Sequence, residues 1–124
     1  MTSTLIDTNI LIDVLEVRQP HVGWVTRHLA ALADDGPLVI NQVIYGEVSV
    51  PYPSKQEFDE LVLRDWLAHE HVPWEAAFLA GKAFDDYRQR GGVKLNTLPD
   101  FLIGGHAAVK NYRVLTRDPA RFRT

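Results

Sequence analysis

The fold is decided by a stretch near the start of the chain, T-L-I-D-T-N-I-L at residues 4–11. Its first three residues form a short, mostly apolar run that ends at Asp7, a pattern typical of a buried strand. After Asp7, apolar residues recur at positions 10, 11, 14 and 15, which is the spacing of one face of a helix. We therefore predict a strand that passes directly into a helix, with an acidic side chain at the junction.

The same alternation continues along the 124 residues of the chain. Further strands are predicted at 38–40 and 112–115, with a weaker candidate at 72–74, because Pro73 cannot donate to a sheet. Helices are predicted over 8–17, 20–33, 42–50, 54–68, 75–90 and 100–110, with a last helical turn from Asp118. Short apolar strands that alternate with helices predict an α/β sandwich around a mostly parallel sheet.

Length and composition limit the possible classes of protein. A chain of this length fits one domain, which we predict to span residues 1–124. The absence of cysteine excludes a disulfide scaffold, a cysteine-ligated zinc site and thiol catalysis. The sequence has no apolar run of about 18 residues and no signal-peptide pattern at its start, so we expect a cytoplasmic protein without a membrane span.

Charge is distributed unevenly along the chain, although the formal net charge is only −3. Residues 1–87 have a net charge of −9, whereas residues 88–124 have a net charge of +6. A basic end on an acidic chain indicates a polyanionic partner, with a solvated surface as the simpler alternative. The basic end contains only two acids, Asp100 and Asp118.

Four acidic residues stand out by their position: Asp7, Glu47, Asp100 and Asp118. Asp7 and Asp118 each follow a predicted strand, and ligands of α/β sheets bind beyond the carboxyl ends of the strands. Glu47 shares its helix face with apolar neighbours, where an unpaired carboxylate is costly. Asp100 opens a helix. Asp7, Asp100 and Asp118 could each simply cap a helix, so this alternative stays open.

A metal ion would explain why such acids converge. Four carboxylates at one edge of a sheet repel one another and need positive charge between them. Mg²⁺ or Mn²⁺ supplies that charge, because these ions prefer carboxylate oxygens, whereas zinc prefers nitrogen and sulfur. A metal held there lowers the pKa of a bound water and stabilises a leaving oxygen. The expected reaction is hydrolysis of a phosphodiester.

Four segments that contain these acids resemble, in order, the motifs of one family. They are L-I-D-T-N-I-L-I-D at 5–13, Y-G-E-V at 45–48, L-P-D-F-L-I at 98–103 and V-L-T-R-D-P-A-R-F at 114–122. Together they span nearly the whole chain and look like the motifs of PIN-domain ribonucleases, especially the VapC-type toxins of bacterial toxin–antitoxin pairs. The resemblance implies a PIN-like three-layer α/β/α sandwich with a central, mostly parallel sheet.

The resemblance also implies a metal-dependent endoribonuclease that acts as a toxin. By motif match, the catalytic and Mg²⁺- or Mn²⁺-binding acids are Asp7, Glu47, Asp100 and Asp118, and the polar groups that orient them are Asn9 and Thr116. The implied partners are an RNA substrate, a VapB-like antitoxin and a second copy of the chain in a homodimer. VapC-like chains often continue into a further strand, so a closing edge strand, or some interface, is expected to be missing here.

Basic residues near these acids are candidates for binding RNA phosphates, because cationic side chains supply much of the affinity for nucleic acids. Arg117 and Arg121 flank the fourth acid, and Arg88 extends the basic track. Arg88 is equally well explained as a cation at the C-terminus of a helix.

Three other functions stay open. The same acids suit a nuclease that cuts DNA or structured nucleic acid, and a direct comparison of RNA and DNA cleavage separates the two. A phosphatase that forms an aspartyl-phosphate at Asp7 usually has a second Asp two residues on, where this chain has Asn9. A PIN-like binding module without catalysis is disfavoured, because acids occupy all four motif positions.

Overall fold

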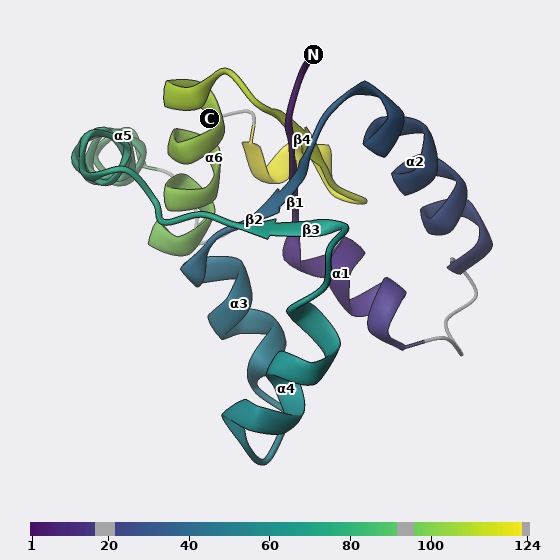
Figure 1. Cartoon of the computed structure of the whole chain (residues 1–124). Coiled ribbons are helices and arrows are strands. Elements are labelled where there is room, and N and C mark those ends of the chain that lie inside the picture. The colour runs from purple at the N-terminus through teal and green to yellow at the C-terminus, as the bar shows by residue number, and fades with distance from the viewer. Residues whose placement is uncertain (17–21, 92–95, 123–124) are drawn as a thin grey trace.

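The computed structural model describes residues 1–16, 22–91 and 96–122 (Figure 1). Its strands are β1 (Thr4–Ile6), β2 (Leu38–Ile40), β3 (Leu67–His69) and β4 (Arg113–Leu115). Its helices are α1 (Thr8–Leu15), α2 (Val22–Asp35), α3 (Gln42–Ser49), α4 (Lys55–Val62), α5 (Trp74–Gln89), α6 (Leu98–Lys110) and a short 3₁₀ helix, η1 (Pro119–Phe122).

The four strands form one parallel sheet in the order β3-β2-β1-β4. β1 lies inside the sheet, where Leu5 pairs with Val39 of β2 on one side and with Val114 of β4 on the other. Every residue of β1 is buried, which explains why this strand is so apolar. Within the described residues, β3 and β4 form the two edges of the sheet.

Helices cover both faces of the sheet (Figure 1). α5 and α6 lie on one side of the strands and α2 on the other, whereas α1 and α3 begin directly beyond the ends of β1 and β2. The core between these layers is aliphatic, with Ile10, Ile44 and Ile103 fully buried. The predicted α/β/α sandwich with a parallel sheet is confirmed.

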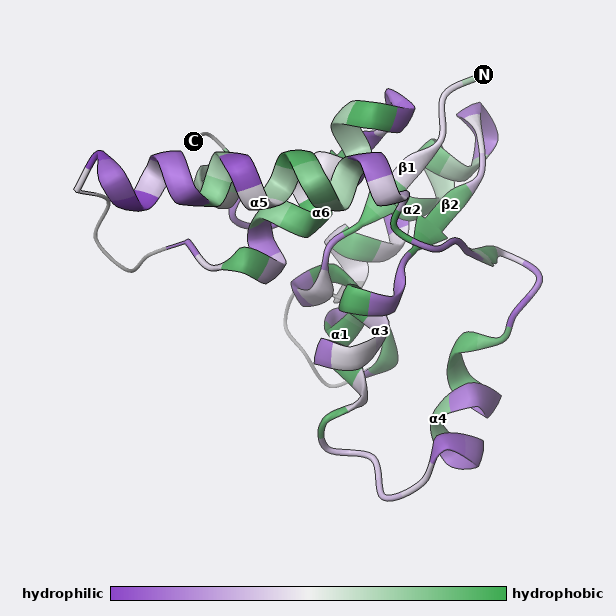
Figure 2. Cartoon of the chain, turned by 90° about the vertical axis from the view of Figure 1, so that its left-hand side faces the viewer, coloured by the Kyte–Doolittle hydropathy of each residue, from purple (hydrophilic) through white to green (hydrophobic). Residues whose placement is uncertain are grey.

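α5 packs along α6 at one side of the molecule (Figure 2). The two helices approach closely because Gly105 of α6 has no side chain: a Cβ atom there would lie 3.0 Å from the carbonyl oxygen of Ala76. Figure 2 also shows hydrophilic residues toward the C-terminal end of α5. Neither of these helices, nor any other within the described ranges, combines the length and hydrophobicity that a transmembrane span requires.

The prediction for residues 54–68 and 72–74 is wrong in part. The helix expected over 54–68 ends at Val62, and the strand expected at 72–74 lies earlier, as β3. Of residues 72–74, Pro73 is instead the N-cap of α5 and Trp74 is its first residue. The physical reason is pairing with β2, in which Leu67 lies opposite Leu38. This contact outweighs the helical spacing of the apolar residues before it.

The strand order creates a switch point between β1 and β4. From β1 the chain continues to β2 and β3 on one side of the sheet, and only later adds β4 on the other side. Ligands of sheets with this topology bind at the carboxyl ends of the strands that flank the switch point. Asp7 follows β1 and Thr116 follows β4 at this edge.

Candidate active site

Asp7 and Thr116 meet at the switch point. The Oγ1 atom of Thr116 donates a hydrogen bond of 2.7 Å to Oδ2 of Asp7, although the two residues are 109 positions apart. The other carboxylate oxygen accepts a bond of 2.8 Å from the backbone nitrogen of Thr8, so that Asp7 also caps α1. Asp7 is fully buried, and these bonds fix the orientation of its carboxylate.

Thr116 gathers further polar groups around Asp7. Its Oγ1 atom accepts a bond of 3.0 Å from the backbone nitrogen of Asp118, and Nδ2 of Asn9 donates to the same oxygen at 3.4 Å. The hydroxyl therefore donates once and accepts twice, which is its full capacity. The role of Asn9 and Thr116 in orienting the acids stays a prediction, and these contacts support it.

Glu47 reaches this group of residues from α3. Its Oε1 atom accepts a hydrogen bond of 2.6 Å from Oγ1 of Thr8, the residue whose backbone nitrogen binds Asp7. Glu47 is half-buried, and this bond offsets part of the cost of placing its carboxylate among apolar neighbours. Thr8 thus links the first two predicted acids, a role that the sequence patterns did not indicate.

Asp100 lies in the first turn of α6, whose N-terminal end is directed toward the edge where β1 ends (Figure 1). Its Oδ2 atom accepts a bond of 2.9 Å from the backbone nitrogen of Thr97, and the two residues form a capping box. Asp100 therefore does cap a helix, which is the alternative to metal binding that its position in the sequence leaves open. Capping does not exclude metal binding, because an ionised carboxylate has about four lone-pair sites.

The structure does not assemble the four acids into a ready metal site. Asp118 is exposed. Within residues 1–16, 22–91 and 96–122, no three acidic or histidine side chains form a group that could hold a metal ion. The donor chemistry nevertheless fits one, because the buried carboxylates of Asp7 and Asp100 are the oxygen ligands that Mg²⁺ and Mn²⁺ prefer. The catalytic and metal-binding roles of the acids stay predictions.

Arg117 makes an ion pair with Asp13 of α1. Its Nε atom lies 2.7 Å from Oδ2 of Asp13, and its Nη2 atom lies 3.3 Å from Oδ1. Asp13 is only 1% exposed. Sequence reasoning did not single out Asp13, although its position four residues after Asn9, on the same face of the predicted helix, was a usable signal. The contacts with Asp13 use the guanidinium that the sequence predicts to bind a phosphate, and they do not test that prediction.

The structure describes the side chain of only one of the other two arginines predicted to bind phosphate. Arg88 is near the C-terminal end of α5, where its guanidinium lies 5.6 Å from the ring centre of Phe84. The side chain of Arg121 lies outside the described part of the structure.

A partly buried polar network joins the residues that follow β2 and β3 to α6. Nδ2 of Asn41 lies 3.0 Å from Nδ1 of His106, and Nε2 of His106 lies 3.0 Å from Oε1 of Glu70. The Oδ1 atom of Asn41 accepts two backbone N–H groups of α3 and caps that helix. The amide nitrogen of Asn41 can therefore only donate, so that Nδ1 of His106 accepts and its Nε2 donates to Glu70.

Tyr112, the residue directly before β4, completes the network. Its hydroxyl donates a hydrogen bond of 2.7 Å to Oε2 of Glu70. Burial acts to raise the pKa of Glu70, but hydrogen bonds from His106 and Tyr112 outweigh it, so that this pKa is lowered. Burial and the bond to the Glu70 carboxylate raise the pKa of Tyr112 to about 12.

We expect the phenol of Tyr112 to ionise near pH 12, whereas an ordinary tyrosine ionises near pH 10. Because its pKa is higher in the folded state, the contribution of Tyr112 to stability is complete below pH 10 and is lost between about pH 10 and pH 12. The measurement is the tyrosinate absorbance during alkaline titration of the wild type and of Tyr112→Phe. The difference between the two curves should rise near pH 12, and a rise near pH 10 would contradict the prediction.

A second polar cluster joins α3 to α4. The hydroxyl of Tyr45 donates a bond of 2.6 Å to Oδ1 of Asp59, and Nζ of Lys55 lies 2.5 Å from Oδ2. Hydrogen bonds from Lys55 and then from Tyr45 lower the pKa of Asp59, and the bond to Asp59 raises the pKa of Tyr45. Tyr45 and Glu47 are two residues apart and therefore lie on roughly opposite sides of α3.

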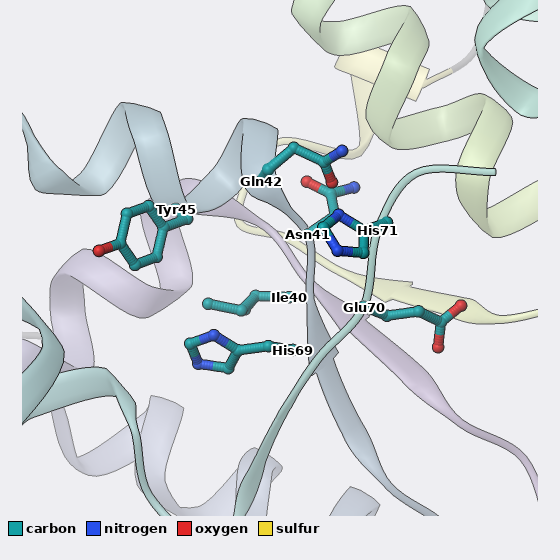
Figure 3. A pocket seen from close by; sticks show the side chains of 7 residues that line it. All are labelled: Ile40, Asn41, Gln42, Tyr45, His69, Glu70 and His71. Atoms are coloured by element: carbon teal, nitrogen blue, oxygen red, sulfur yellow. The ribbon is translucent and has the colours of Figure 1, made fainter. Parts of the chain in front are cut away.

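Figure 3 shows a small pocket at the carboxyl ends of β2 and β3. Its volume is about 140 Å³, and it is lined by Ile40, Asn41, Gln42, Tyr45, His69, Glu70 and His71. The carboxylate of Glu70 points away from Tyr45 in this view. Among the described residues, those that line the pocket include none of the four predicted acids. The pocket lies on the side of α3 that carries Tyr45, so we do not include it in the candidate active site.

The chain matches the family model described as the PIN domain over residues 4–124. It belongs to the PIN domain family. The resemblance of the four sequence motifs to PIN domains is thereby confirmed. No curated protein matches this PIN domain.

Three solved structures share the fold of this PIN domain at low sequence identity. VapBC2 from Rickettsia felis, bound to a promoter DNA fragment, is 17% identical, with 98% of this chain and 93% of that chain covered and a TM-score of 0.75. VapC20 from Mycobacterium tuberculosis, described as a sarcin-ricin loop cleaving toxin, is 12% identical, with 94% and 90% covered and a TM-score of 0.71. FitAcB from Neisseria gonorrhoeae is 18% identical, with 96% and 90% covered and a TM-score of 0.69.

Proposed function

We propose that this PIN domain is a metal-dependent endoribonuclease and the toxin of a toxin–antitoxin pair. The observation that carries the proposal is the buried carboxylate of Asp7, oriented by Thr116 at the switch point of the sheet. The family match over residues 4–124 supports a nuclease, and the description of VapC20 as a toxin that cleaves the sarcin-ricin loop supports RNA as the substrate.

The residues proposed to hold Mg²⁺ or Mn²⁺ are Asp7 and Asp100, with Glu47 and Asp118 completing the acidic site. When bound, the ion would supply an activated water and positive charge for the leaving oxygen. The protein's own contribution is orientation. Thr116 holds one oxygen of Asp7, the backbone of Thr8 holds the other, and the hydroxyl of Thr8 holds Glu47. Such support of ligands is worth about 10- to 100-fold in metal affinity or activity.

The proposed partners follow from the same assignment. RNA is the substrate, with Arg88 and Arg121 as predicted phosphate contacts. A VapB-like antitoxin neutralises the toxin, which the presence of VapBC2 among the structural neighbours supports. We also propose that the chain forms one domain over residues 1–124, assembles as a homodimer and acts in the cytoplasm, where a toxin of this kind meets cellular RNA.

Metal removal is expected to abolish RNA cleavage. The purified protein, freed of any bound antitoxin and treated with EDTA, should leave a structured RNA intact, and Mg²⁺ or Mn²⁺ should restore cleavage. Metal binding itself is measured separately, as a rise in the melting temperature on addition of Mn²⁺, because an ion that binds only the folded state stabilises it.

Parallel reactions on DNA of the same sequence serve as the control. Cleavage of DNA in preference to RNA would replace the proposal by a DNA nuclease. Tight binding of RNA without cleavage, at saturating Mn²⁺, would leave a binding module, and cleavage that persists in EDTA would exclude the metal-dependent mechanism.

A further inference from the structure

Asp13 and Arg117 form an ion pair that the proposed chemistry does not use. The guanidinium contacts both carboxylate oxygens, at 2.7 and 3.3 Å. The side chain of Asp13 is 1% exposed, whereas that of Arg117 is 36% exposed. An ionised carboxylate at this depth is costly unless it is paired, so Asp13 depends on this guanidinium.

The pair holds the loop after β4 against α1. Asn9 and Asp13 are four residues apart and therefore lie on the same face of α1. Oδ1 of Asn9 accepts a bond of 3.2 Å from the backbone nitrogen of Arg117, and Asp13 binds the side chain of the same residue one turn further along. Arg117 is thus fixed to α1 through both its backbone and its side chain.

Arg117 stands between two residues of the candidate active site. Thr116 precedes it and donates to Asp7, while Asp118 follows it and donates its backbone N–H to Thr116. The preceding strand, β4, is an edge strand whose residues are exposed or half-buried, so the sheet holds this loop on one side only. A displacement of Arg117 would therefore move the hydroxyl that orients Asp7.

We propose that the Asp13–Arg117 pair positions Thr116 on Asp7, and that Arg117 acts through Asp13 and not by binding an RNA phosphate. The inference deepens the proposed function and rests on it. Binding a phosphate would require the guanidinium to leave Asp13, and a buried carboxylate would then lose its partner. Arg117 is accordingly a positioning residue, and Asp13 anchors it.

The test is a double-mutant cycle of Arg117→Ala, Asp13→Asn and the variant with both substitutions. Each single substitution is expected to lower kcat for RNA cleavage about 10- to 100-fold with KM unchanged, as for other groups that orient a metal ligand. The double variant should be no slower than the slower single variant, because both residues act through one contact. It also lacks the unpaired buried charge, so it should fold even if Arg117→Ala does not.

Arg113→Ala is the matched control. Arg113 lies on β4 and pairs with Asp35, and both side chains are 45% exposed. Its removal deletes an arginine ion pair from β4, four residues before Arg117, and should leave kcat unchanged. A loss of kcat in Arg113→Ala as large as in Arg117→Ala would overturn the proposal, because it would reflect general damage to β4.

A measurement of RNA binding distinguishes a positioning role of Arg117 from direct contact with an RNA phosphate. In an Asp7→Asn background, Arg117→Ala should bind an RNA oligonucleotide with unchanged affinity and unchanged salt dependence. A phosphate contact would instead weaken binding and reduce the salt slope by about 1. Such a loss of RNA binding would overturn the proposal. Single variants that keep the wild-type kcat would also overturn it, as would losses of kcat that multiply in the double variant.

Failure of the proposed function has a different signature. If the wild-type protein cleaves no RNA, the nuclease assignment fails, and the pair is then tested by Mn²⁺ binding alone. Arg117→Ala and Asp13→Asn should each weaken Mn²⁺ binding about 10-fold or more relative to Arg113→Ala, because the pair supports Asp7. Wild-type Mn²⁺ affinity in both variants would overturn the positioning role whatever the reaction.

Discussion

Asp7→Asn is expected to slow RNA cleavage on the order of 10³-fold while the PIN domain stays folded. Asparagine keeps the shape of the side chain, and its oxygen can still accept the backbone N–H of Thr8 that Asp7 binds. It removes the charge needed to hold a divalent ion. Charge stabilisation by a metal is worth several kcal/mol, which corresponds to the expected loss at about 1.4 kcal/mol per tenfold. The measurement is single-turnover cleavage at saturating Mn²⁺.

Asp34→Asn is the matched control for this prediction. Asp34 is an exposed acid of α2, so the substitution changes the net charge equally without touching the site. It should cleave RNA at the wild-type rate and should remain toxic when expressed in cells, whereas Asp7→Asn should lose toxicity. The metal-nuclease assignment fails if Asp7→Asn retains the wild-type rate at equal concentrations of protein, RNA and metal.

Asn41→Ala is expected to lower the free energy of unfolding by about 3 kcal/mol. Asn41 is 2% exposed. The substitution removes the cap of α3, worth about 1–2 kcal/mol, and leaves the buried Nδ1 of His106 without its donor, which costs about 1–3 kcal/mol. Urea denaturation followed by circular dichroism measures the change. Activity should fall as well, because α3 carries Glu47.

Ser54→Ala is the control for capping alone. Ser54 caps α4 through one bond of 3.2 Å to the backbone nitrogen of Glu57, at an exposed site. Its loss should cost about 1 kcal/mol or less. Equal destabilisation by Ser54→Ala and Asn41→Ala would mean that the buried network with His106 adds nothing to the cap.

Much of the fold could be predicted from the sequence because its determinants are local. The run that ends at Asp7 is β1, and the apolar spacing after it is α1, whose first turn Asp7 caps. Pro99 and the capping box around Asp100 similarly mark the start of α6. In each case a few neighbouring residues carry both the pattern and the interactions that produce the element.

β3 could not be predicted because its cause is distant in sequence. Residues 67–69 are a strand through their pairing with 38–40, whereas the apolar residues before them have helical spacing. A short edge strand has little periodicity of its own, since only Leu67 of its three residues is buried. Its assignment requires knowledge of the sheet that it joins.

The candidate site was predictable as a set of acids but not as a set of contacts. Motif matching pointed to Asp7 and Thr116, and the structure joins them directly. It did not point to Thr8, which links two acids, or to Asp13, which anchors Arg117. Their partners, Glu47 for Thr8 and Arg117 for Asp13, lie far away in the sequence, so these contacts become visible only in the folded chain.

The 109-residue separation between Asp7 and Thr116 has a consequence for protein synthesis. A ribosome synthesises Asp7 109 residues before Thr116, and domains generally fold as units during synthesis. A nascent chain therefore carries an acid whose supporting hydroxyl has not yet been made. Under the proposed function, the nascent chain would be harmless to the RNA of the translating ribosome, and activity would arise in one step once β4 had paired with β1.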